Sequence, residues 1–140
     1  MILTRSYEMR VWYVDTDQMG IVHHSNYVKY YEAARSDLMR DLGVSYAEME
    51  RRGVMMPILE VHSIYKASAR FDEVIRVEIS LEQLPMARIN FLYTIYGESG
   101  TLLNTGSTVL GFMHSDTRRP TRAPKWFVEM LESAAADSES

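Results

Sequence analysis

The sequence predicts an α+β fold in which one long helix packs against an antiparallel sheet. Two patterns carry this prediction. Five separate segments have the character of β-strands, and one long segment between the first two of them repeats its apolar residues at helical spacing. A helix with one apolar stripe and a sheet with one apolar face bury both surfaces when the sheet packs around the helix. We expect one domain over residues 1–133, followed by a small, acidic segment, 134–140, that frays.

The first strand is predicted over residues 7–13, because apolar and polar residues alternate there. Its buried face carries Tyr7, Met9, Val11 and Tyr13. The next segment, 15–20, is too polar and too interrupted by glycine to extend the strand, so it predicts a loop.

The long helix is predicted to start at Asn26, with Ser25 or Asn26 as its N-cap and Gly43 at its end. Its apolar residues recur every three or four positions and form a wide stripe along one side. The stripe consists of Tyr27, Tyr30, Tyr31, Ala34, Leu38 and Leu42.

A short helix, four strands and a closing helix are predicted after the long helix. Ser45 and Glu48 have the spacing of a capping box at the start of the short helix, and Gly53 ends it. The strands are predicted over residues 58–69, 75–81, 89–95 and 102–114. The turn 97–100 joins the last two strands in a hairpin. The closing helix begins near Pro124, and its inner side carries Trp126, Phe127, Met130 and Leu131.

The overall composition excludes several classes of protein. With a net charge of −4, the chain lacks the basic surface of a nucleic-acid-binding protein. The absence of cysteine excludes disulfide bonds, thiolate catalysis and zinc sites built on sulfur. No apolar run is long enough to cross a bilayer, and the first residues lack the basic-then-apolar order of a signal peptide. We therefore expect a cytoplasmic protein with no nucleic-acid partner and no membrane insertion.

The segment 13–27 holds the residues best suited to chemistry. Asp17 can act as a general base or as a nucleophile. The start of the long helix offers unpaired main-chain N–H groups and a positive dipole end, which suit an oxygen that gains negative charge. His24 lies beside that start, where it can pass a proton or hydrogen-bond the substrate. This combination fits acyl transfer from a thioester to water, because a thiol of pKa about 8–9 departs with little help from an acid.

Other polar residues in the chain are given structural interpretations. We expect Asp15 to bond loop amides rather than to react. His23 and His24 have no third ligand at a recognisable spacing, and His62 and His114 lie in separate predicted strands. No metal site is therefore predicted.

Three parts of the sequence, in the same order along the chain, resemble one enzyme family. The first part consists of Tyr13, Asp15-Thr16-Asp17, Gly20-Ile21-Val22, His24 and Asn26-Tyr27, followed by Tyr30-Tyr31-Glu32-Ala33-Ala34-Arg35. The second is the segment 65–73, which contains Ala69-Arg70-Phe71-Asp72, and the third is Arg119-Pro120 with Pro124 before the last helix. Together they resemble the hotdog-fold thioesterases, in particular the 4-hydroxybenzoyl-CoA thioesterase family and its acyl-CoA hydrolase branch associated with the bacterial Tol–Pal system.

The resemblance implies a hotdog fold, in which a five-stranded antiparallel sheet wraps a long central helix and a further helix closes the chain. It also implies hydrolysis of an acyl or aroyl thioester of coenzyme A to the free acid and CoA, without a cofactor. Asp17 is then the nucleophile or general base, a main-chain N–H near His24 polarises the carbonyl, and the side chains of His24 and Tyr13 assist. A homodimer or homotetramer with the active site at the dimer interface is implied too, in agreement with the open sheet edge that such a fold leaves.

The expected substrate contacts lie in the loop, at the helix start and on two arginines. They are Gly20, Val22, Ser25, Asn26, Tyr27, Arg70 and Arg88. The arginines supply the fixed positive charge that the phosphates of CoA require. Met19 stands where many members of the branch carry a small or acidic residue, so the acyl group is not carried over from the family.

Two other functions are compatible with the same fold. One is a non-catalytic acyl-CoA-binding or scaffold protein. The other is a hydroxyacyl-thioester dehydratase, which places its acidic residue on the long helix. Glu32 is the only early acid of that helix and lies two turns in, which disfavours dehydration.

Overall fold

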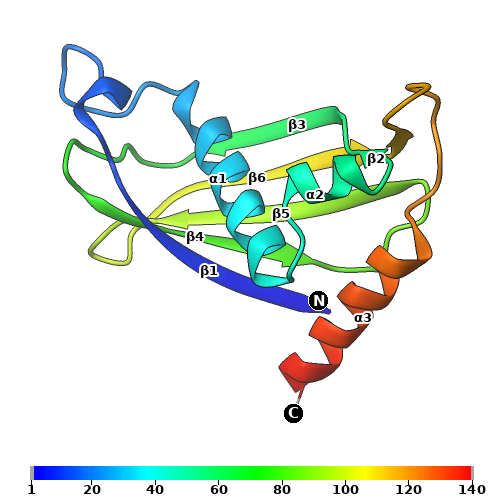
Figure 1. Cartoon of the computed structure of the whole chain (residues 1–140). Helices are drawn as coiled ribbons and strands as arrows, with labels where there is room; N and C mark the ends of the chain where they lie inside the picture. Colours follow the sequence, from blue (N-terminus) through cyan, green and yellow to red (C-terminus); the bar gives the residue numbers. More distant parts are fainter. Residues whose placement is uncertain (1, 140) are drawn as a thin grey trace.

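The computed structural model describes residues 2–139 of the chain and has an α+β architecture (Figure 1). Its helical elements are the 3-10 turn η1 (Tyr13–Asp15) and the helices α1 (Asn26–Asp41), α2 (Tyr46–Arg51) and α3 (Lys125–Glu139). Its strands are β1 (Leu3–Arg10), β2 (Val54–Met55), β3 (Ile58–Tyr65), β4 (Val74–Leu81), β5 (Arg88–Tyr96), β6 (Leu102–Gly111) and β7 (Met113–His114).

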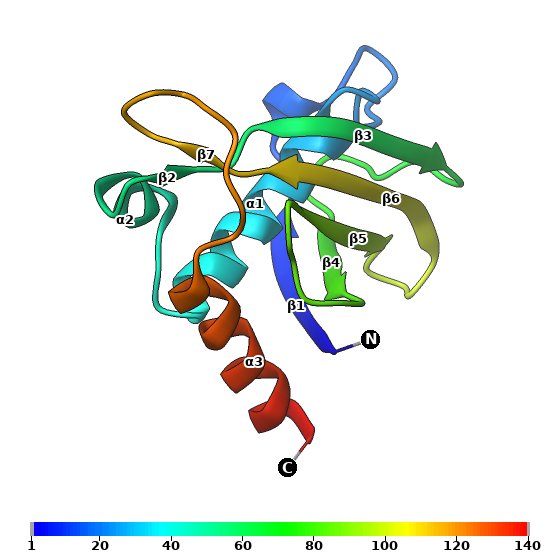
Figure 2. The ribbon, with the colours of Figure 1, turned by 90° about the vertical axis from the view of Figure 1, so that its right-hand side faces the viewer.

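Five strands form one antiparallel sheet in the order β1-β4-β5-β6-β3. β1 pairs with β4 over its whole length, from Leu3 opposite Leu81 to Arg10 opposite Val74. The sheet curves around α1, which lies against one of its faces, while α3 lies at the end of the molecule away from the loop that precedes α1 (Figures 1 and 2). The predicted hotdog arrangement of helix and sheet is therefore confirmed.

The core lies between α1 and the concave face of the sheet. The predicted stripe of α1 is buried from Tyr27 to Leu38, and the alternating residues of β4 and β5 face it. The buried residues of these two strands include Ile75, Val77, Ile79, Leu81, Ile89, Phe91, Tyr93 and Ile95. Period-two alternation on the strands and helical spacing on α1 thus place apolar side chains on facing surfaces.

The first strand lies earlier in the chain than predicted. β1 begins at Leu3 and ends at Arg10, and the alternation of burial continues only as far as Val11. The chain then turns, because the main-chain N–H of Asp15 bonds the Trp12 carbonyl at 3.0 Å and forms η1. The prediction that Tyr13 faces inward from a strand is therefore wrong: its side chain is 76% exposed.

Two of the later strands, those predicted over 58–69 and 102–114, end earlier than predicted. β3 ends at Tyr65, and the segment expected over 102–114 divides into β6 and β7 around the buried Phe112. β7 leaves the large sheet and pairs with β2, a two-residue strand that the sequence patterns did not indicate. The expected helix boundaries agree better, because Gly43 and Gly53 follow α1 and α2 with positive φ angles of 98° and 97°.

β3 forms one edge of the sheet and carries an unusual number of exposed apolar side chains. Within the described chain it pairs only with β6. Its exposed apolar residues are Ile58, Leu59, Val61, Ile64 and Tyr65. An edge strand with free main-chain groups and apolar side chains is a surface that favours pairing with another strand.

The end of the chain is helical as far as it is described. α3 packs Phe127 and Leu131 into the core and continues to Glu139, so helical backbone extends into the segment expected to fray. Fraying of that segment stays a prediction, and residue 140 lies outside the described residues. None of the helices within residues 2–139 combines the length and the apolar character that spanning a bilayer requires.

Candidate active site

The loop between η1 and α1 folds back on itself as a small hairpin. The main-chain N–H of Asp17 bonds the Ile21 carbonyl at 2.9 Å, and the N–H of Gly20 bonds the Asp17 carbonyl at 3.0 Å. Gly20 has a φ of 77°, a conformation that glycine adopts without the strain a side chain would add. Below the turn, Val22 bonds the Ala69 carbonyl at 2.8 Å, which fastens the loop to the segment after β3.

Asp17 occupies the turn of this hairpin with its side chain exposed. One carboxylate oxygen, Oδ1, accepts a hydrogen bond of 2.8 Å from the Met19 main-chain N–H. No ion pair of Asp17 is formed within the described part of the chain. The carboxylate borders a cavity of about 380 Å³ whose lining residues are Asp17, Ile21, Val22, His23, His24, Tyr27, Tyr65, Lys66, Ala67 and Ser68.

One main-chain N–H at the start of α1 remains available at this cavity. The N–H groups of Asn26 and Tyr27 bond the carbonyls of His23 and His24 at 3.0 and 3.3 Å, and the Ser25 N–H bonds the His23 ring at 3.3 Å. Among residues 2–139, the His24 N–H has no hydrogen-bond partner. A free amide beside a helix N-terminus suits a carbonyl oxygen that gains negative charge.

Tyr65 and Tyr27 fix the peptide that follows His24. The Tyr65 hydroxyl donates to the His24 carbonyl at 3.1 Å, and its ring lies edge-on to the His24 ring at 6.2 Å and to the Tyr27 ring at 5.3 Å. The Tyr27 hydroxyl accepts from the Ala69 N–H at 3.1 Å, and burial raises the pKa of this phenol. The end of β3 and the start of α1 are thereby held together at the cavity.

Asp15 is buried at the base of the loop that carries Asp17. Its carboxylate accepts hydrogen bonds from the Lys29 ammonium and, at 3.0 Å, from the Tyr30 hydroxyl. Burial opposes ionisation of this carboxyl, but the bonds from Lys29 and Tyr30 outweigh it and hold its pKa below the ordinary value. The expectation that Asp15 bonds loop amides agrees with a 3.4 Å bond from the Trp12 N–H.

The structure brings four of the expected site residues to the cavity: Asp17, Val22, His24 and Tyr27. Gly20, Ser25 and Asn26 lie next to it without lining it. The Asn26 side chain bonds the Asp15 carbonyl at 2.9 Å, and the Ser25 hydroxyl bonds the His23 ring at 2.8 Å.

Three expected site residues lie away from this cavity. The exposed ring of Tyr13 lies edge-on to Phe71 at 5.5 Å, because η1 turns it off the line of β1. Arg88 begins β5 opposite Gly111. Arg70 borders a second hollow, and the roles expected for these three residues stay predictions.

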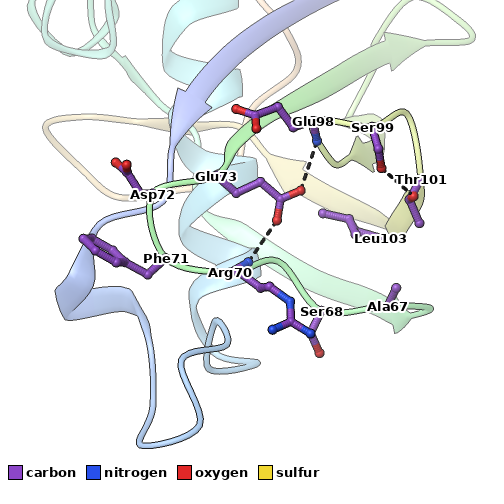
Figure 3. Close-up of a pocket in the computed structure, with 10 residues that line it drawn as sticks. All are labelled: Ala67, Ser68, Arg70, Phe71, Asp72, Glu73, Glu98, Ser99, Thr101 and Leu103. Atoms are coloured by element: carbon purple, nitrogen blue, oxygen red, sulfur yellow. Dashed lines mark hydrogen bonds between the residues drawn. The ribbon is translucent and has the colours of Figure 1, made fainter.

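The second hollow, of about 770 Å³, adjoins the cavity at Asp17 and shares Ala67 and Ser68 with it (Figure 3). Two carboxylates accept main-chain hydrogen bonds at its edge. Glu73 accepts from the N–H groups of Arg70 and Glu98, each at 3.0 Å, and Glu98 accepts from the Val74 N–H at 3.1 Å. These two acidic groups and Asp72 outnumber the single arginine that lines the hollow, so its charge does not favour phosphate.

Sequence reasoning did not assign the residues that the end of β3 brings to the site. Tyr65, Lys66, Ala67 and Ser68 all line the cavity, and they lie about 40 positions after the helix start. The only sequence signal was their place in the second family-like segment. Within the described residues, no group of three or more His, Cys, Asp or Glu side chains is placed to share one metal ion.

The arrangement of residues around the cavity defines a class of protein. Asp17 and His24, whose main-chain N–H is free among the described residues, line one cavity on a hotdog fold, an arrangement suited to acyl transfer to water. Comparison with known families supports this class: the model of the thioesterase-like superfamily matches residues 11–131. The chain belongs to the thioesterase-like superfamily, which confirms the predicted fold family and the predicted enzyme class of thioester hydrolase.

Individual relatives agree with this assignment. YneP of Bacillus subtilis, provisionally named an acyl-CoA thioesterase, is 37% identical over 95 residues that cover 68% of this chain and 69% of YneP. The acyl-CoA thioester hydrolase YbgC of Escherichia coli is 28% identical over 120 residues, 86% of this chain and 90% of YbgC. The crystal structure of a DHNA-CoA thioesterase from Staphylococcus aureus has a TM-score of 0.85 and 33% identity, covering 97% of this chain and 91% of that one.

Proposed function

We propose that this protein hydrolyses acyl-CoA thioesters to a free acid and CoA, with Asp17 as the catalytic carboxylate. The observation that carries the proposal is that Asp17 and His24, whose N–H is free among the described residues, line the same cavity. The His24 amide donates to the thioester carbonyl oxygen, while Asp17 acts on the carbonyl carbon or on the attacking water. The names of YneP and YbgC support CoA as the carrier.

Two routes use these groups and give the same products. As a general base, Asp17 takes a proton from water, and the resulting hydroxide displaces the CoA thiolate. As a nucleophile, its carboxylate displaces the thiolate to form an anhydride, which water then cleaves to the acid and free Asp17. In both routes the water proton finally resides on the CoA thiol at a pH below its pKa of about 8–9. Neither route requires a cofactor.

The two alternative functions find less support in the structure. Glu32 is exposed and is absent from the cavity lining, whereas a dehydratase needs an acid on the helix beside its substrate. A non-catalytic binding protein would be favoured by an Asp17 that is buried in an ion pair with no pocket beside it. Instead Asp17 is exposed, lines the cavity and has one oxygen committed to the Met19 N–H.

The proposed enzyme is a homodimer or homotetramer that pairs its subunits through β3. Exposed apolar side chains along this edge strand supply the contact surface. Because Tyr65 ends β3 and lines the cavity, such pairing places the catalytic site at the subunit boundary. Its location in the cytoplasm is part of the same proposal, since acyl-CoA is an intracellular substrate.

Replacing Asp17 with asparagine tests the catalytic assignment. We expect thioesterase turnover of Asp17→Asn to fall at least about a hundredfold, because the amide can neither accept a proton nor attack as a carboxylate. Turnover is measured with a panel of aliphatic and aromatic acyl-CoAs through release of the free thiol. Asp116→Asn is a matched control, since Asp116 also accepts a turn amide, that of Thr117 at 2.7 Å, but lies outside the cavity.

The panel also separates the alternatives. Near-normal turnover by Asp17→Asn would remove Asp17 from the mechanism. Wild-type protein that binds acyl-CoA but releases no thiol across the panel would favour the binding protein. Hydration or dehydration of a hydroxyacyl thioester without thiol release would favour the dehydratase.

A further inference from the structure

We infer that Asp15 is a positioning residue, which fixes the Asp17 loop against the start of α1. This inference rests on the proposed role of Asp17 and extends it to a residue that never meets the substrate. Asp15 is only 3% exposed and is absent from the cavity lining. Any effect of Asp15 on turnover must therefore pass through the atoms that it holds.

The Asp15 carboxylate connects the loop to the second turn of α1. It accepts hydrogen bonds from Lys29 and Tyr30, which are adjacent on the helix, so its position along the helix is defined by two contacts. Lys29 remains half exposed, whereas Tyr30 is buried. A buried carboxylate that is bonded by a cation and a hydroxyl is held firmly, because breaking these hydrogen bonds would leave its charge poorly compensated in the interior.

The Asp15 main chain connects the two ends of the loop. Its carbonyl accepts from the His23 N–H at 2.9 Å and from the Asn26 side chain at 2.9 Å. The hairpin loop therefore begins at Asp15 and ends at His23, which is bonded to it. Asp17 lies in the turn of the hairpin, and His24 follows its last residue. Asp15 thus sets the separation between the carboxylate and the amide that act on the thioester, and such separations affect turnover steeply.

Asp15→Asn and Lys29→Gln test this inference against a control on the same helix. Asp41→Asn removes the matched contact at the other end of α1, where the Tyr7 hydroxyl donates to Asp41 at 2.6 Å. We expect Asp15→Asn to lower kcat at least about tenfold and to leave KM within about threefold of wild type. The reason is that the separation of the Asp17 carboxylate and the His24 amide affects the transition state rather than substrate binding. Lys29→Gln shifts kcat in the same direction, and Asp41→Asn leaves kcat within about twofold.

Amide hydrogen exchange gives a second readout that does not depend on turnover. We expect the His23 N–H to exchange about tenfold faster in Asp15→Asn and Lys29→Gln, and unchanged in Asp41→Asn. Where Asp15→Asn does not fold, Lys29→Gln decides, because its half-exposed side chain can be replaced without opening the core.

The outcomes separate this inference from the proposed function. Two results would overturn the positioning role of Asp15 and leave the proposed hydrolysis intact. One is that Asp15→Asn and Lys29→Gln have the kcat of wild type. The other is that Asp41→Asn lowers kcat as much as they do. If wild type shows no turnover, the proposed function fails. The positioning inference is then decided by hydrogen exchange alone, and an unchanged exchange rate of the His23 N–H in Asp15→Asn and Lys29→Gln would overturn it.

Discussion

Two aspartates separated by one residue have opposite environments in this molecule. Asp15 is buried and bonded to α1, whereas Asp17 is exposed at a cavity. The sequence predicted their different roles from family resemblance and loop chemistry. It could not identify Lys29 and Tyr30 as the partners of Asp15, because those contacts depend on how the loop returns to the helix. Charge alone therefore does not distinguish a buried, anchoring carboxylate from an exposed one that is proposed to react.

The lowered pKa of Asp15 gives a pH dependence to stability. Its unfolded pKa is about 3.9, and its folded pKa is lower, so the stabilisation is complete above the unfolded value and disappears as pH falls through the folded value. We expect wild type to exceed Asp15→Asn in free energy of unfolding by about 1–3 kcal/mol at about pH 7, and by less at about pH 3. Urea unfolding at the two pH values measures this. A difference that stays constant with pH would contradict it.

At the scale of elements, periodic patterns were sufficient to predict α1, β4, β5 and the start of α3. Their apolar residues recur at the spacing of the element, and the structure buries those positions. The patterns failed where an element ends, at Arg10, Tyr65 and Gly111, because strand ends depend on tertiary bonds such as that from the Gly111 N–H to Pro57. The cavity residues at the end of β3 were missed for the same reason.

The contact between α1 and β6 depends on one glycine. A Cβ at Gly106 would lie 2.1 Å from the Tyr31 hydroxyl and 2.7 Å from the His62 carbonyl. That hydroxyl bonds Ser63 at 2.9 Å as well as Asn104, and burial raises its pKa to about 12. Gly106→Ala must therefore displace α1 or break a buried polar network.

We expect Gly106→Ala to lower the free energy of unfolding by about 1–3 kcal/mol, measured by urea unfolding. Gly111→Ala is the control on the same strand, since its added Cβ meets only the flexible Leu59 side chain, at 3.2 Å. Equal losses in the two variants would show that the Tyr31 contact has no special weight.

At the scale of the whole molecule, the edge strand β3 connects the proposed assembly with the proposed active site. The sequence predicted an edge that needs covering, but not which strand would form it, because strand order follows from long-range pairing of β1 with β4 and of β3 with β6. The exposed apolar residues of β3 then become informative only once the sheet order is known.

Placing a charge on this edge tests the proposed assembly. Ile64 is 56% exposed on β3, and we expect Ile64→Lys to convert the oligomer into monomers, because a buried lysine without a partner opposes edge pairing. Sedimentation velocity measures the mass. Met86→Lys is the control, since Met86 is 69% exposed but lies in the β4–β5 turn. An Ile64→Lys protein with the mass of wild type would place the interface elsewhere.

The free N–H at position 24 belongs to the main-chain peptide between His23 and His24, whose carbonyl accepts from the Asn26 N–H at 3.0 Å, and not to the histidine side chain. Every amino acid except proline supplies that same group. The N–H that is proposed to polarise the thioester carbonyl is therefore retained in most amino-acid substitutions at position 24. The groups that hold it act on the carbonyls on either side: the Asn26 N–H bonds the His23 carbonyl, and the hydroxyl of Tyr65, forty-one positions after His24, bonds the His24 carbonyl.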